Sequence, residues 1–99
     1  MKVVWSSEAS YTFEQNIIYL QTEWNESVID SFITRTEQAI ELISKNPLLF
    51  PVLNKKKAIH RCVIVKQITL YYHVADNYVL LLTFWNNYQN PKKLKNIIG

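Results

Sequence analysis

The sequence predicts an α+β domain with the element order β-α-α-β-β-β, in which a helical hairpin packs on a small antiparallel sheet. Three observations predict it. A short β-branched and aromatic stretch opens the chain, two stretches with helical spacing of apolar residues follow, and three strand-like stretches fill the second half. A length of 99 residues suits one domain, so residues 1–99 are expected to fold as a single unit.

The first strand is expected at residues 2–5, and the first helix directly after it. Ser6 or Ser7 can accept hydrogen bonds from the free backbone N–H groups of the first turn, and Glu8 complements the helix dipole. Apolar side chains then recur every three or four residues, which places them on one helical face. They are Ala9, Phe13, Ile17, Leu20 and Trp24.

A second helix follows with almost no connection. Asn25 repeats the capping signal, and an apolar stripe runs over residues 28–43. The helix stops at Asn46, because a residue before proline avoids the α conformation. Two helices joined so closely must fold back as a hairpin. Residues 48–54 lack a helical period and are expected to form a loop.

Three antiparallel strands are expected at 59–66, 68–75 and 78–85, with a tight turn at Asp76 and Asn77. Alternation gives the sheet an apolar face for the helical hairpin and a mixed, partly exposed face. In the last strand, the side chains assigned to the apolar face are Leu80, Leu82 and Phe84. Those assigned to the mixed face are Val79, Leu81, Thr83 and Trp85. A basic tail with a short helix around 93–97 ends the sequence.

The charges are divided along the chain. Residues 1–41 hold seven of the eight acidic residues, and residues 42–99 hold nine of the eleven basic ones. This asymmetry indicates a surface for an anionic partner in the second part, with a merely solvated surface as the alternative. The candidate nucleic-acid or target contacts are Lys55, Lys56, Lys57, Lys66, Lys92 and Lys93.

Several classes of chemistry are not expected. Cys62 is the single cysteine, so it has no intramolecular partner, and its apolar neighbours favour a buried, unreactive side chain. Two histidines without a cysteine pair give no metal site, and the only glycine is the last residue, so no phosphate loop is expected. We therefore expect no cofactor, no metal and no membrane contact, and a cytoplasmic protein.

One set of residues could support RNA cleavage by attack of a 2′-hydroxyl. That reaction needs a base, an acid and a cation, and His73, Tyr88 and Arg61 fit these roles by type. Two of them have a structural alternative: His73 as a half-buried strand residue, and Arg61 as an ion-pair partner of Asp76 or of an acidic residue of the helices. The neighbouring aromatic side chains could stack on bases or simply stabilise the sheet as cross-strand pairs.

The order of elements and several local patterns resemble the ParE branch of the RelE/ParE toxin superfamily, the plasmid-stabilisation toxins. The resemblance covers nearly the whole chain and depends on the joint order and spacing of its motifs. The segments that carry it are Val4-Trp5-Ser6, Ile18-Tyr19-Leu20, Asn46-Pro47-Leu48-Leu49-Phe50-Pro51, Arg61-Cys62-Val63-Ile64-Val65-Lys66, Leu70-Tyr71-Tyr72-His73-Val74 and the stretch from Leu82 to Leu94.

This resemblance implies two antiparallel helices on a small antiparallel sheet, and a toxin neutralised by a cognate antitoxin. It implies one of two targets: messenger RNA cut on the ribosome, or DNA gyrase. A homodimer or a toxin–antitoxin hetero-oligomer is expected, and a non-toxic protein- or RNA-binding relative is the alternative. Arg61 and Lys66 match basic positions of the family, whereas Tyr88 stands where this branch often has arginine, which loses a fixed charge.

Overall fold

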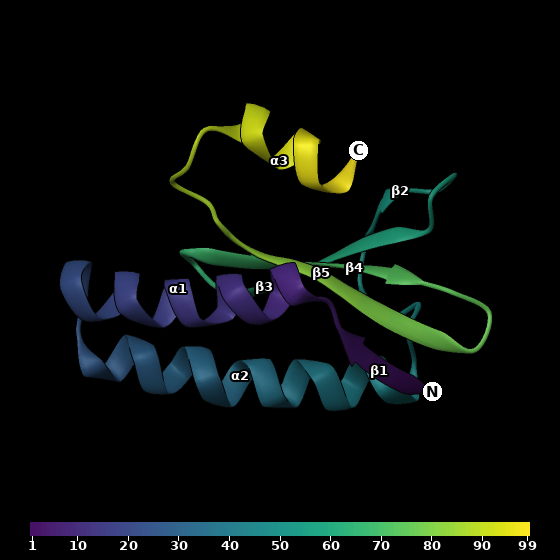
Figure 1. The fold of residues 1–99 in the computed structure, drawn as a ribbon. Helices are drawn as coiled ribbons and strands as arrows, with labels where there is room; N and C mark the ends of the chain where they lie inside the picture. Colours follow the sequence, from purple (N-terminus) through teal and green to yellow (C-terminus); the bar gives the residue numbers. More distant parts are fainter.

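A computed structural model describes residues 1–99 as three layers: a helical hairpin, a five-stranded sheet and a short helix on the opposite face (Figure 1). The predicted α+β class is confirmed. In chain order the elements are β1 (Lys2–Trp5), α1 (Ser7–Glu23), α2 (Glu26–Lys45), β2 (Val52–Asn54), β3 (Ile59–Val65), β4 (Ile68–Val74), β5 (Tyr78–Asn86) and α3 (Pro91–Ile98).

Both helices of the hairpin begin at the expected caps. The Ser6 hydroxyl accepts from the Ala9 amide at 3.0 Å, and the Asn25 side chain accepts from the Val28 amide at 3.1 Å. Trp24, expected in the apolar stripe of the first helix, instead caps its C-terminus and is 41% exposed. Its indole N–H donates to the Tyr19 hydroxyl at 3.3 Å.

The sheet has the strand order β1-β5-β4-β3-β2 and is mixed. The expected antiparallel arrangement holds from β2 to β5, but β1 lies parallel to β5, with Val3 opposite Val79. The expected loop at 48–54 contains the short edge strand β2, which pairs with the start of β3. Alternation alone could not reveal this strand, because it has only three residues.

The predicted side-chain faces of the first half of β5 are wrong, because the strand contains a bulge. Tyr71 lies opposite Thr83 and Tyr72 opposite Leu81, so Leu82 is an extra residue between the two pairs. Before the bulge, Val79 and Leu81 point into the core, although they were assigned to the mixed face. After it, Phe84 is in the core, as expected. The half-buried Leu80 therefore lies on the face turned away from the hairpin.

The core lies between the helical hairpin and the sheet. Phe32 and Ile43 of α2 and Leu20 of α1 are fully buried against Leu70 and Phe84. Rings from four elements meet at one end, with centroids 5.1–6.0 Å apart, a separation typical of stabilising aromatic pairs. They belong to Trp5, Phe13, Phe32 and Phe84.

The expected helix in the basic tail is confirmed and is longer than residues 93–97. Asn90 accepts from the Lys92 amide at 3.0 Å, and Pro91 occupies the first turn, where its missing N–H costs nothing. The helix lies over the sheet face that the hairpin leaves free (Figure 1). The mixed face is therefore more covered than expected, and Tyr71 and Trp85 are only 7% and 6% exposed.

Candidate functional site

Arg61, Tyr71 and His73 lie together on the sheet face turned away from the hairpin. Arg61 on β3 is directly opposite Tyr71 on β4, and His73 is two residues farther along the same strand. Alternation gives all three the same face, within the roughly 7–8 Å expected of diagonal neighbours. An open hollow of about 540 Å³ surrounds the first two. Its other lining residues are Phe50, Pro51, Cys62, Val63, Thr69 and Asn87.

The electrostatics of this hollow depend on burial and on Arg61. Burial raises the pKa of the Tyr71 hydroxyl, and the positive charge of Arg61 offsets part of that rise. Arg61 itself is exposed, and the single ion pair of the structure joins Lys45 to Glu41. The alternative in which Arg61 pairs with Asp76 or with an acidic residue of the helices is therefore wrong, and its guanidinium can reach an anionic ligand.

The imidazole of His73 is held in one orientation. Its Nδ1 lies 2.7 Å from the carbonyl oxygen of Lys57. A carbonyl oxygen only accepts, so Nδ1 carries the hydrogen and Nε2 of the neutral ring carries a free lone pair. His73 is half-buried, and this tautomer is the one that a general base requires.

Tyr88 does not join this group. It follows the end of β5, is 57% exposed, and its hydroxyl makes no hydrogen bond in the structure. Tyr71 and Trp85 are too deeply buried to present their faces to a base. They lie opposite Thr83 and Thr69, so the alternative of cross-strand pairs that stabilise the sheet describes them better. The other histidine, His60, is buried, stacks on Tyr72 and bonds to the carbonyl of Phe50.

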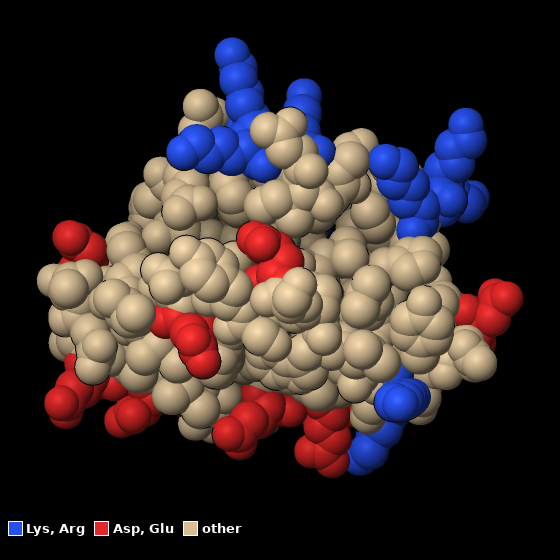
Figure 2. All heavy atoms as spheres, viewed as in Figure 1, with Lys and Arg blue, Asp and Glu red and all other residues tan.

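The acidic first part and the basic second part of the sequence lie on different sides of the folded protein (Figure 2). Acidic side chains spread over the helical hairpin, while lysines gather on the opposite side, over α3 and the turn between β2 and β3. Lys55, Lys56 and Lys57 occupy that exposed turn, as expected, and Lys57 Nζ also reaches the carbonyl of Gly99 at 3.1 Å. The candidate lysines thus share one side with the Arg61 hollow, apart from Lys66 in the β3–β4 turn.

Three further findings bear on what the protein can do. No cluster of three or more His, Cys, Asp or Glu side chains is placed to hold a metal ion. None of the helices combines the length and apolar character needed to cross a membrane. Cys62 is buried in the core, and burial raises the pKa of its thiol to about 11, which is opposite to what a nucleophilic thiolate needs.

Solved structures share this architecture along almost their whole length. The chromosomal ParDE system of P. aeruginosa aligns with a TM-score of 0.70 at 6% identity, over 87% of this chain and 95% of that one. The chain has the fold of the RelE/ParE toxins. A YoeB/ParE toxin from Agrobacterium tumefaciens, at 14% identity, aligns with a TM-score of 0.64 over 89% and 100% of the two chains.

The same fold occurs in a heterotetrameric YoeB–YefM toxin–antitoxin complex from Staphylococcus aureus. That match has a TM-score of 0.60 at 17% identity, over 89% of this chain and 98% of the other. No family model matches the sequence. No curated protein matches it either. The RelE/ParE fold is thus supported by structural agreement, although the sequence identity to these three structures is only 6%, 14% and 17%.

The sequence places Asn87 on the mixed face of the last strand but does not predict the hydrogen bonds that it makes in the hollow. Its side-chain oxygen accepts from the Thr69 hydroxyl at 3.0 Å, and its amide donates to the Lys66 carbonyl at 3.1 Å. These bonds tie the segment after β5 to β4 and to the β3–β4 turn, and shape one wall of the hollow. The only sequence signal was an asparagine pair at a strand end, which is typical of many turns.

Proposed function

We propose that the chain is the toxin of a type II toxin–antitoxin pair, inhibits bacterial growth and is neutralised by a cognate antitoxin protein. The observation that carries the proposal is the whole-length agreement of its fold with the ParDE system and with YoeB in its complex with YefM. The heterotetramer of that complex supports a hetero-oligomer with the antitoxin here as well.

Of the two targets that the family resemblance implies, messenger RNA on the ribosome is favoured over DNA gyrase. The observation that favours RNA is that Arg61 and His73 lie together on the sheet face turned away from the hairpin. A protein that acts only by binding needs no adjacent base and cation. Nε2 of His73 would remove the 2′-hydroxyl proton, and the 2′-oxygen would attack the adjacent phosphorus. Arg61 would stabilise the charge that develops on the phosphoryl oxygens.

The proton for the leaving 5′-oxygen would come from Tyr88. Its side chain is exposed and its hydroxyl makes no hydrogen bond. The segment that carries Tyr88 lies outside the sheet, so bound RNA would have to bring this hydroxyl close to Arg61 and His73. The lysines of α3 and of the β2–β3 turn would hold the neighbouring phosphates, a contribution that weakens as salt rises.

Induction of the chain in a bacterium, with and without a candidate antitoxin gene, tests the toxin proposal. We expect growth arrest with the chain alone and normal growth with both. Arg61→Ala should relieve the arrest and slow cleavage by about a hundredfold, as loss of one charge-stabilising donor does in other enzymes. Arg35→Ala removes the same charge from the exposed face of α2 and is the matched control.

Toeprinting on ribosomes, beside a gyrase supercoiling assay, tests the target. Cleavage that depends on Arg61 would support the RNA target. Loss of supercoiling without cleavage would overturn it in favour of gyrase. Unimpaired growth on induction would overturn the toxin proposal and leave a non-toxic binding relative.

A further inference from the structure

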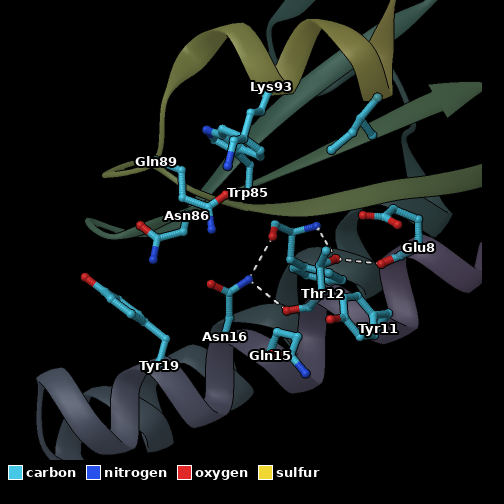
Figure 3. A pocket seen from close by; sticks show the side chains of 12 residues that line it. Glu8, Tyr11, Thr12, Gln15, Asn16, Tyr19, Trp85, Asn86, Gln89 and Lys93 are labelled. Atoms are coloured by element: carbon cyan, nitrogen blue, oxygen red, sulfur yellow. Dashed lines mark hydrogen bonds between the residues drawn. The ribbon is translucent and has the colours of Figure 1, made fainter.

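A second cleft lies between α1 and α3, at the edge of β5 and apart from the Arg61 hollow. It has a volume of about 390 Å³, within the range of small-molecule sites. Figure 3 shows side chains from both helices and from the end of β5 converging on it. They are Glu8, Tyr11, Thr12, Gln15, Asn16, Tyr19, Phe84, Trp85, Asn86, Gln89, Lys93 and Ile97.

The α1 wall of this cleft presents one fixed hydrogen-bond acceptor. Asn16 is only 5% exposed, and its amide nitrogen donates to the carbonyls of Thr12 at 2.8 Å and Phe84 at 2.7 Å. Carbonyls only accept, so the nitrogen and the oxygen of this side chain cannot be exchanged. The oxygen has no partner, and because no fully buried side-chain atom is left unpaired, it is open to the cleft.

The β5 wall presents one fixed donor. Asn86 is 7% exposed, and its side-chain oxygen accepts from the Tyr88 amide at 2.9 Å. A backbone N–H only donates, so this bond also assigns the oxygen and nitrogen of the Asn86 amide, and it leaves the nitrogen free. Two largely buried side chains therefore turn a free acceptor and a free donor toward the same small cleft (Figure 3).

The ligand must supply a donor and an acceptor close together, which both a peptide group and the edge of a nucleobase do. A peptide in extended form would dock by pairing with a strand edge. The β5 edge is already occupied here, because Thr12 accepts from the Phe84 amide at 2.9 Å and Asn16 bonds to the Phe84 carbonyl. A planar heterocycle needs no such edge, and its faces can pack on aromatic side chains.

The remaining lining residues suit such a heterocycle with a phosphate attached. Tyr19 supplies aromatic surface from α1, and Lys93 brings a positive charge from α3. We propose that the α1–α3 cleft is a nucleotide-binding site, in which Asn16 and Asn86 hold the edge of the base and Lys93 contacts the phosphate. The site goes beyond the proposed toxin function, and neither an antitoxin nor a ribosome is needed to test it.

Titration of the protein with AMP, CMP, GMP and UMP tests the proposal, with ribose 5-phosphate as the base-free probe. Two-dimensional NMR would follow the side-chain amide signals of Asn16 and Asn86 and the indole signal of Trp85. We expect at least one nucleotide to shift all three signals at millimolar concentration, and ribose 5-phosphate to leave them unmoved. Asn86→Asp removes the donor but keeps the oxygen that accepts from Tyr88.

We expect Asn86→Asp to weaken binding by about tenfold, the effect of one hydrogen bond of about 1.4 kcal/mol. Asn77→Asp makes the same change in the β4–β5 turn and should bind as the wild type. Equal shifts with ribose 5-phosphate would reduce the site to a phosphate contact and overturn the proposal. Unchanged affinity in Asn86→Asp, or no shift with any of the four nucleotides, would also overturn it.

Discussion

Replacement of Asn16 by leucine should destabilise the protein substantially. Asn16 is the partner of the Phe84 carbonyl, at 2.7 Å, on the edge of β5 that β1 no longer covers. The amide of Phe84 points the same way, to the Thr12 hydroxyl, so alternation along the strand turns this carbonyl away from β4. Leucine has a similar volume, keeps the carbonyl covered and offers it no donor.

The cost can be estimated from this single carbonyl. The Thr12 carbonyl keeps its helical partner, so only the Phe84 carbonyl loses its hydrogen bond. A buried acceptor left unsatisfied costs roughly 1–3 kcal/mol. We therefore expect the free energy of unfolding to fall by about 2 kcal/mol, which in a domain of this size lowers the melting temperature by about 10 °C.

Urea unfolding followed by circular dichroism measures this loss. We expect a lower midpoint with an unchanged slope, which reports stability rather than a change in the surface exposed on unfolding. Gln15→Leu makes the same kind of change one residue earlier, at an exposed position, and should stay within about 0.5 kcal/mol of the wild type. A midpoint for Asn16→Leu equal to that of this control would refute the role assigned to the edge contact.

Three further predictions follow from individual side chains. Near neutral pH, iodoacetamide should modify Cys62 far more slowly in the native protein than in the urea-unfolded chain, since burial raises the thiol pKa to about 11; equal rates would contradict its burial. Burial also raises the pKa of Tyr72 to about 12 from its usual 10.0, so the folded state binds this proton more tightly than the unfolded chain. Stability should therefore be fully present below pH 10.0 and fall as pH rises towards about 12, measured as urea midpoints, and Tyr72→Phe should show a smaller fall. In the toeprinting assay, Tyr88→Phe should lose cleavage while Tyr78→Phe, which removes a hydroxyl from the far end of β5, should retain it; the opposite result would exclude Tyr88 as the acid.

Features set by neighbouring residues were predictable from the sequence. The caps at Ser6 and Asn25 depend on a few adjacent atoms, and the adjacency of Arg61 and His73 follows from strand alternation once the two strands pair. The hydrophobic pattern gave no sign of the bulge at Leu82, because apolar residues stand on both sides of it. A single extra residue there was enough to reverse the predicted faces of Val79 and Leu81.

Features that depend on distant segments were not predictable. The parallel pairing of β1 with β5 and the burial of Trp85 each join parts of the chain that no local pattern connects. The α1–α3 cleft is of the same kind, because Asn16 and Asn86 come together only when the finished sheet lies against α1. Their identity as asparagines was visible, but the orientation that leaves one acceptor and one donor free is a product of the tertiary structure.

The pairing of β1 with β5 has a consequence for synthesis of the protein. β1 is made first, at Lys2–Trp5, yet its partner residues in β5 are Tyr78–Leu81. Translation adds about 5–20 residues each second, so the first strand waits several seconds for its neighbour. β3, β4 and β5 pair between sequence neighbours and can assemble earlier. The sheet is therefore completed only after β5 has left the ribosome, when β1 can take its place beside that strand.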